Sequence, residues 1–192
     1  MGTAAANHRL SVDEFLEWES LQEQRYELVD GLVRAMAGGT ADHNTIVLNL
    51  VGALRTATRE SGCRVFAESM KVIVDGAVMY ADVVVTYAPV EPKADSVKAP
   101  VLVIEVLSRS THEIDRGRKW LAYQQLESLQ QYVLISQDQP RVEIYRRNPA
   151  SKHGWSYDVV MGLAATVLLE PGTSPMTLAE IYEGSSVADT SD

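Results

Sequence analysis

Two carboxylates lie within apolar, β-branched segments of the sequence, where a charged side chain is costly to bury. Asp82 opens the run Val83-Val84-Val85, and Glu105 directly follows Val101-Leu102-Val103-Ile104. Both runs are typical of buried strands. An ionised carboxylate in such a strand needs a hydrogen bond, an ion pair or a bound metal to offset its lost hydration. The two acids, with Lys119 downstream, indicate a divalent-metal hydrolytic site.

The positions of the two acids within their strands allow them to meet. Alternate side chains of a strand share a face, so Glu105 is expected beside Val103 and Leu107. Asp82 opens its strand and Glu105 lies near the end of its own, so antiparallel neighbours would bring the two carboxylates together. Mg²⁺ prefers carboxylate oxygens with water and substrate phosphate, and can activate that water. The plainer alternative makes each acid a solvated residue at a strand end.

Asp115, Lys119 and Tyr123 recur every four residues and therefore share one face of a helix predicted over 111–126. One interpretation is a surface Asp–Lys pair worth about 0.3–0.5 kcal/mol. The other brings the ammonium of Lys119 beside the acids, where it can stabilise developing negative charge. Spacing alone favours the surface pair. Arginines around the start of this helix are candidates to bind phosphate: Arg109, Arg116 and Arg118.

The remaining patterns predict a mixed β-sheet flanked by helices, hence an α/β or α+β fold. Hairpins are expected at Asp30-Gly31 and at Asp75-Gly76, the second joining strands 64–74 and 77–87. A long core-facing helix is expected from Ala41 to Glu60. Further helices and strands are predicted at 11–18, 101–108, 131–136, 141–147, 155–161 and 176–182. We expect a single domain over 11–184, with flexible ends at 1–10 and 185–192.

Composition narrows the function classes. The 192 residues are 46% hydrophobic and 22% charged, which is ordinary for a soluble globular protein. No apolar run approaches the roughly 20 residues that cross a bilayer, so no membrane partner is expected. Cys63 is the only cysteine, which favours a cytoplasmic protein. The formal net charge of −9 argues against a protein that coats nucleic acid, but not against a metal-dependent nuclease.

The histidines and glycines give weaker signals. The spacing of the histidines does not match that of a zinc site, and His43, near a predicted helix start, is interpreted as structural or surface-exposed. Gly38-Gly39-Thr40 lacks the lysine of a phosphate-binding loop.

Several segments together resemble the Uma-two family of restriction-endonuclease-like proteins, within the PD-(D/E)XK nuclease superfamily. The likeness covers about residues 10–184, and its most specific block begins at Glu105. The matching segments are Tyr26-Glu27-Leu28-Val29-Asp30-Gly31, His43, Asp82-Val83-Val84-Val85, Glu105-Val106-Leu107-Ser108-Arg109-Ser110-Thr111 with Asp115, Lys119 and Tyr123, and the strands at 132–135 and 142–146.

The resemblance implies a restriction-endonuclease-like domain that holds Mg²⁺ or Mn²⁺. The metal ligands would be Asp82, Glu105 and the backbone carbonyl of Val106. Glu27 would lie at the cleft, and the catalytic set would be Asp82, Glu105, Lys119 and Glu27.

The sequence departs from the superfamily pattern at two positions. Ala81 replaces the proline of the PD motif, which takes no part in the chemistry. Leu107 occupies the place of the superfamily's lysine, and the resemblance implies that Lys119, on the following helix, has taken over its role.

These observations favour a divalent-metal-dependent endonuclease that hydrolyses DNA. A catalytically inactive module with the same fold, binding nucleic acid or protein, is the alternative, and a hydrolase of another phosphodiester is a third. Binding alone does not require two buried acids, which favours catalysis. Edge strands often pair between subunits, so a homodimer is also expected.

Overall fold

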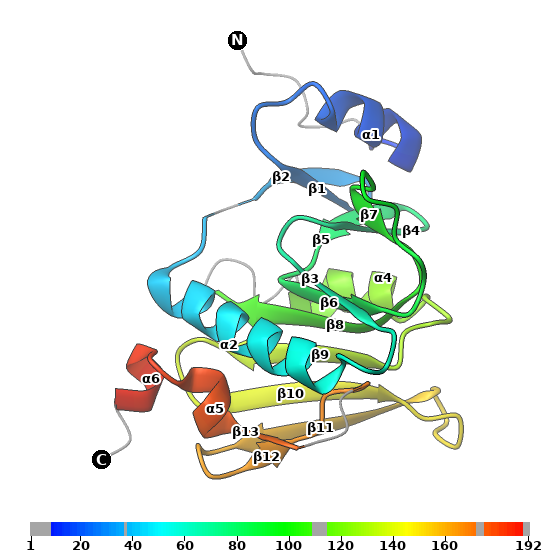
Figure 1. The fold of residues 1–192 in the computed structure, drawn as a ribbon. Helices are drawn as coiled ribbons and strands as arrows, with labels where there is room; N and C mark the ends of the chain where they lie inside the picture. Colours follow the sequence, from blue (N-terminus) through cyan, green and yellow to red (C-terminus); the bar gives the residue numbers. More distant parts are fainter. Residues whose placement is uncertain (1–8, 37, 109–114, 172–174, 190–192) are drawn as a thin grey trace.

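The computed structural model describes residues 9–36, 38–108, 115–171 and 175–189 (Figure 1). It confirms the predicted mixed α+β fold in a single domain. The strands form two large sheets and one small one, whereas the sequence predicted a single sheet. Among the described residues, no helix combines the length and the apolar content needed to cross a membrane.

The first sheet has five strands in the order β2-β1-β5-β4-β7 and carries the N-terminal helix. Its hairpin at Asp30-Gly31 is confirmed, since both residues take the positive φ angles of 54° and 71° that such turns need. Helix α1 begins with a capping box between Ser11 and Glu14. The elements are α1 (Val12–Glu19), β1 (Tyr26–Val29), β2 (Leu32–Ala35), β4 (Lys71–Val74), β5 (Ala77–Tyr80) and β7 (Ser96–Val97).

The second sheet has six strands in the order β11-β10-β9-β8-β6-β3. Its central strand β8 pairs antiparallel with β6 and parallel with β9. The strand that follows Asp82 and the strand that contains Glu105 are therefore antiparallel neighbours, as expected. The strands are β3 (Arg64–Ala67), β6 (Val83–Thr86), β8 (Pro100–Leu107), β9 (Gln131–Ser136), β10 (Arg141–Arg147) and β11 (Trp155–Met161); β12 (Thr166–Val167) and β13 (Met176–Thr177) form the small sheet.

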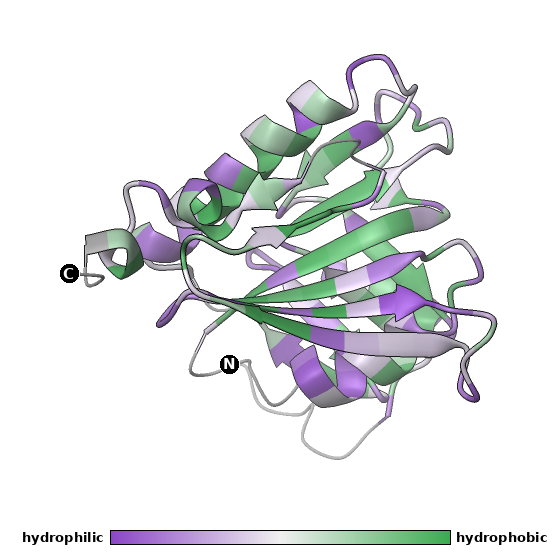
Figure 2. Cartoon of the chain, turned by 90° about the horizontal axis from the view of Figure 1, so that it is seen from below, coloured by the Kyte–Doolittle hydropathy of each residue, from purple (hydrophilic) through white to green (hydrophobic). Residues whose placement is uncertain are grey.

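Helices cover both faces of the six-stranded sheet. Helix α2 (Ala41–Ala57) packs on one face, and Ile46, Leu50 and Leu54 enter the core there. The π-helical turn η1 (Asp115–Lys119) and α4 (Trp120–Tyr123) pack on the other. Figure 2 shows hydrophobic residues concentrated in the strands and hydrophilic ones on the surrounding helices and loops.

The C-terminal helices α5 (Leu178–Tyr182) and α6 (Ser186–Asp189) follow the small sheet. Residues 186–189, which the sequence assigned to the tail, therefore form a helix. It is attached to α2 because the backbone N–H of Ser186 donates to Asp42 at 2.9 Å.

The predicted second hairpin divides between the two sheets, which corrects the sequence interpretation. Its turn at Asp75-Gly76 joins β4 and β5 in the first sheet, but its outer parts, β3 and β6, pair in the second. Between them, Glu68 has a positive φ of 52°, and its N–H donates to the carbonyl of Asp82 at 3.2 Å. The pairing of the strands is interrupted at these residues. The two segments, from β3 to β4 and from β5 to β6, therefore cross between the sheets at the same place.

The helix predicted over 111–126 is described only from Asp115. Residues 109–114, including Arg109, lie outside the described part of the chain. The π-helical turn precedes the α-helical one, a form that was not predicted. Leu121, on α4, is 58% exposed and therefore does not pack on the core.

Candidate active site

Asp82 lies where the chain crosses between the two sheets, one residue before β6. Its Oδ2 accepts the N–H of Val106 at 2.6 Å. The register Val83–Ile104 of the β6–β8 pair brings the segments of Asp82 and Glu105 to the same end of the two strands. The other carboxylate oxygen of Asp82 faces the start of α2, where His43 Nε2 lies 3.4 Å from Oδ1.

Glu105 and Lys119 form a buried ion pair beneath η1 and α4. Lys119 Nζ lies 3.3 Å from Glu105 Oε1, 3.0 Å from Glu27 Oε1 and 3.4 Å from Asp115 Oδ1. Tyr123 donates its hydroxyl to Glu105 at 3.2 Å. The surface-pair interpretation of Asp115 and Lys119 is wrong, because both residues are buried.

Burial and charge act together on this group of side chains. Removal from water raises the pKa of Glu105 well above its usual range, although Lys119 opposes the shift. Burial alone would lower the pKa of Lys119, but the carboxylates of Glu105, Glu27 and Asp115 outweigh it and hold that pKa well above its usual value. Lys119 is therefore a fixed positive charge among acids.

Glu27 links the five-stranded sheet to this buried pair. It belongs to β1, and its Oε1 accepts the backbone N–H of Tyr80 at 2.9 Å as well as contacting Lys119. The side chain therefore lies between the two sheets, beside Lys119.

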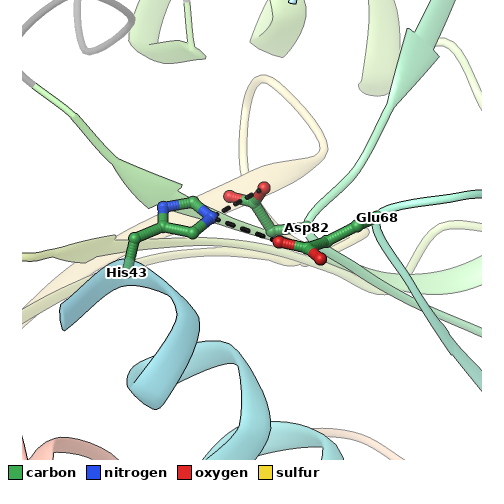
Figure 3. A group of neighbouring side chains, drawn as sticks. All are labelled: His43, Glu68 and Asp82. Atoms are coloured by element: carbon green, nitrogen blue, oxygen red, sulfur yellow. Dashed lines mark ion pairs between the residues drawn. The ribbon is translucent and has the colours of Figure 1, made fainter. Parts of the chain in front are cut away.

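A second cluster contains Asp82, His43 and Glu68 (Figure 3). His43 Nε2 lies 3.7 Å from Glu68 Oε1, in addition to its contact with Asp82. Thr40 caps α2 and accepts the N–H of His43, which fixes the first turn of the helix. Gly39 lies so close that an added Cβ would come within 2.9 Å of the imidazole, so a larger residue there would displace the His43 ring.

His43 is electrostatically tied to both acids. Its hydrogen bond with Asp82 raises the pKa of His43, against the opposing effect of burial, and the charges of Asp82 and Glu68 and the backbone of Val106 add to the rise. The sequence interpretation of His43 as structural or surface-exposed missed this role. Only the family resemblance pointed to His43 in the sequence. Nothing in the sequence pointed to Glu68, because a single acidic residue after a strand is commonplace.

A family model described as "Putative restriction endonuclease", Uma2, matches residues 12–178. The chain belongs to the Uma2 family. The resemblance drawn from the sequence is thereby confirmed, and the match spans α1, both large sheets and every residue of the two clusters.

Two curated relatives and one solved structure are similar to this Uma2 chain. Uncharacterized protein slr1290 of Synechocystis sp. (strain ATCC 27184 / PCC 6803 / Kazusa) is 33% identical over 143 residues, which cover 73% of this chain and 75% of the relative. Uncharacterized protein sll1609 of the same strain is 29% identical, over 87% of this chain and 96% of that protein.

The similar solved structure is described as a putative nuclease belonging to DUF820 from Anabaena variabilis ATCC 29413. It has a TM-score of 0.66 and 20% identity, and the match covers 90% of this chain and 97% of that one. At this identity the likeness establishes the fold.

The His43 cluster has donors suited to a divalent cation. One nitrogen and two carboxylate oxygens lie within 4.8 Å of one another. Ligands about 2.1 Å from an ion in octahedral or tetrahedral geometry are separated by roughly 3.0–3.4 Å, close to the contacts that His43 makes here.

The predicted site residues thus fall into two adjoining groups in this Uma2 protein. Asp82 faces His43 and Glu68, whereas Glu105 faces Lys119, Tyr123 and Glu27. The groups are joined at Val106, whose N–H binds Asp82 and whose chain neighbour is Glu105. A shared ion between Asp82 and Glu105 stays a prediction.

An open groove of about 510 Å³ lies beside the His43 cluster. It runs past the start of α2, and its lining residues include Gly39, Thr40, His43, Ser108 and Gln137. The groove therefore reaches the cluster at His43.

Proposed function

We propose that this Uma2 protein is a divalent-metal-dependent endonuclease that hydrolyses phosphodiester bonds in DNA with Mg²⁺ or Mn²⁺. The observation that carries the proposal is the meeting, at Val106, of a donor cluster around Asp82 with a buried lysine–carboxylate group around Glu105. The first group offers ligands for a metal ion, and the second supplies the fixed positive charge of Lys119. Both serve phosphodiester hydrolysis, because the reaction builds up negative charge on the phosphate.

Asp82 is the central ligand in this proposal. The family pattern adds Glu105 and the Val106 carbonyl, and the geometry offers His43 and Glu68 as further donors. When bound, the ion would supply an activated water and offset negative charge on the phosphate. Ser108 and the start of α2 line the groove through which the scissile phosphate would approach.

Lys119 is assigned the stabilisation of charge that develops on the phosphate during hydrolysis. Its ammonium is held by Glu27 and Glu105, and Tyr123 in turn holds Glu105. Such a fixed charge stabilises a transition state without reorganisation. Glu27 and Tyr123 would therefore act by positioning Lys119 and Glu105.

The buried charges favour this function over a binding module with the same fold. Four ionisable side chains gather here with little exposure to water: Glu27, Glu105, Asp115 and Lys119. Burying charge is costly, and a binding surface elsewhere on the protein would not need this group.

We further propose a cytoplasmic homodimer. The edge strand β11 carries an exposed apolar stripe of Tyr157, Val159 and Met161, as a strand that pairs with a second copy would. Light scattering at several protein concentrations measures the mass in solution, and a monomer throughout would contradict the dimer.

The test of the function is cleavage of plasmid, linear and single-stranded DNA with Mg²⁺ or Mn²⁺, with EDTA as a control. Asp82→Asn keeps an oxygen that can accept the N–H of Val106 but removes the charge that attracts a cation. Cleavage should be lost while circular dichroism stays unchanged. Asp75→Asn, in the exposed turn between β4 and β5, is the matched control and should cleave like the wild type.

Undiminished cleavage by folded Asp82→Asn protein would assign the activity to another site or a contaminant. A wild-type protein that cleaves neither DNA nor RNA would support the binding module. Cleavage confined to another phosphodiester would support the third function.

A further inference from the structure

A second groove, of about 700 Å³, lies between the C-terminal half of α2 and the edge strand β3. Three arginines line it, Arg55, Arg59 and Arg64, and no acid is among its described lining residues. The whole chain carries 26 acidic against 17 basic residues, so a groove with this composition departs from the rest of the protein.

The arginines of this groove are differently placed from those near the active site. Arg116 is paired with the buried Glu143, and Arg118 lies 4.0 Å from Asp30. Within the described part of the chain, no carboxylate lies within ion-pair distance of Arg55 or Arg59, both of which are exposed. Their charges are thus available to an anionic partner.

Arg64 completes the groove at the start of β3. Its guanidinium lies 4.9 Å from the centroid of the Phe66 ring, which is itself part of the lining. A half-buried aromatic ring beside guanidinium groups is the combination that binds phosphates and stacks on bases in nucleic-acid sites.

Both walls of the groove lead to the candidate active site. Strand β3 runs from Arg64 to Ala67 and Glu68 follows it, so Arg64 and Glu68 are four residues apart, about 13 Å at the rise of a strand. Within helix α2, His43 and Arg55 are twelve residues apart, which corresponds to about 18 Å. Figure 1 shows α2 extending across the face of the sheet. At about 3.4 Å per nucleotide along each duplex strand, the groove lies four to five nucleotides from the site.

We propose that this arginine groove binds the sugar–phosphate backbone of the nucleic-acid substrate, about four to five nucleotides from the phosphate at Asp82. The inference rests on the proposed nuclease function and adds the place where the substrate is held. Binding there is electrostatic and therefore independent of base sequence.

The experiment measures binding of a fluorescent 30-base-pair DNA by anisotropy, in EDTA to prevent cleavage, at several salt concentrations. The variant Arg55→Gln/Arg59→Gln removes two charges from exposed positions. Lys152→Gln is the matched control, because Lys152 lies exposed in the turn before β11, at the opposite edge of the six-stranded sheet from β3. Circular dichroism checks that all three proteins are folded.

We expect the arginine variant to bind about tenfold or more weakly at low salt, and its slope of log affinity against log salt to fall by about 1 per arginine. Lys152→Gln should bind like the wild type. If the arginine variant binds DNA as tightly as the wild type, the proposed role of the groove is wrong, while the proposed nuclease function is unaffected. A wild-type protein that binds no DNA, whatever the salt, would also overturn the proposal for the groove, whereas the cleavage assay with Mg²⁺ or Mn²⁺ tests the nuclease function separately.

Discussion

The ammonium of Lys119 lies 3.3 Å from both carboxylate oxygens of Glu105, and neither side chain is more than 6% exposed. The two residues come from different elements, η1 and β8, and stand beside Glu27 of the other sheet. Loss of either charge would leave its partner buried and unpaired at the junction of the two sheets.

Removing the lysine should therefore destabilise the protein. Lys119→Met leaves Glu105, Glu27 and Asp115 close together without a cation, and breaking a buried pair in this way costs about 3–5 kcal/mol. Urea unfolding in EDTA measures the change. The double variant Lys119→Met/Glu105→Gln should recover part of the loss, because one of the unpaired charges is gone. No recovery would mean that the two charges are not coupled.

Lys119→Ala should lower turnover more than metal affinity, because its charge acts on the transition state. Loss of one such stabilising group typically costs about 10²–10³ in rate. Single-turnover cleavage at saturating Mn²⁺, with a separate Mn²⁺ titration by calorimetry, separates the two effects. An equal loss in both quantities would instead make Lys119 a residue that supports the metal site.

His43→Gln and Glu68→Gln should each weaken Mn²⁺ binding by about tenfold or more, because each removes one donor facing Asp82. Calorimetry measures the affinity directly, without an activity assay. His153→Gln, in an exposed turn, is the control. If Glu105→Gln weakens binding while His43→Gln does not, the ion is held by the family set of Asp82, Glu105 and the Val106 carbonyl.

The stability of the metal-free protein should depend on pH through His43. Its pKa is raised in the folded state above the ordinary value of about 6.5, so the protonated form favours folding. This contribution is fully present below pH about 6.5 and is lost as the pH rises through the folded-state pKa. Urea unfolding in EDTA from pH 5.5 to 8.5 should show the decline, and His43→Gln should lack it.

The strands and their alternation could be predicted from the sequence because they depend on local pattern. Strands 131–136, 141–147 and 155–161 have the predicted bounds, and Glu105 lies on the face of Val103 and Leu107, as alternation required. The division of the second hairpin could not be predicted. No glycine or proline interrupts the segments 64–74 and 77–87 in the sequence, and the positive φ of Glu68 marks the change of sheet.

The candidate site was predictable in part for the same reason. Asp82 and Glu105 were singled out because a charge in an apolar strand is a local signal. Lys119 was assigned a part in the site only through the family resemblance, because its helical spacing alone favoured a surface pair. His43 and Glu68 come from α2 and from the loop after β3, and only the three-dimensional fold brings them to Asp82. Their types and spacing along the chain carry no sign of that meeting.

The last prediction concerns Lys71, which anchors α1 on the five-stranded sheet. Its Nζ lies 3.1 Å from Glu19 Oε2 and 2.9 Å from Asp95 Oδ2, and Tyr80 donates its hydroxyl to Glu19 at 2.8 Å. Burial, together with this bond to Glu19, raises the pKa of Tyr80 to about 12. The backbone N–H of Tyr80 also binds Glu27, so this cluster supports one wall of the candidate site.

Lys71→Met should cost about 3–5 kcal/mol in the free energy of unfolding, because it leaves the carboxylate of Glu19 buried without a cation. The exposed Asp95 should contribute little, so Asp95→Asn is the control and should change stability by less than about 1 kcal/mol. Glu19→Gln/Lys71→Met should regain most of the loss, since no buried charge then remains unpaired. If the double variant is as unstable as Lys71→Met, the packing of the lysine stem stabilises α1 rather than its charge.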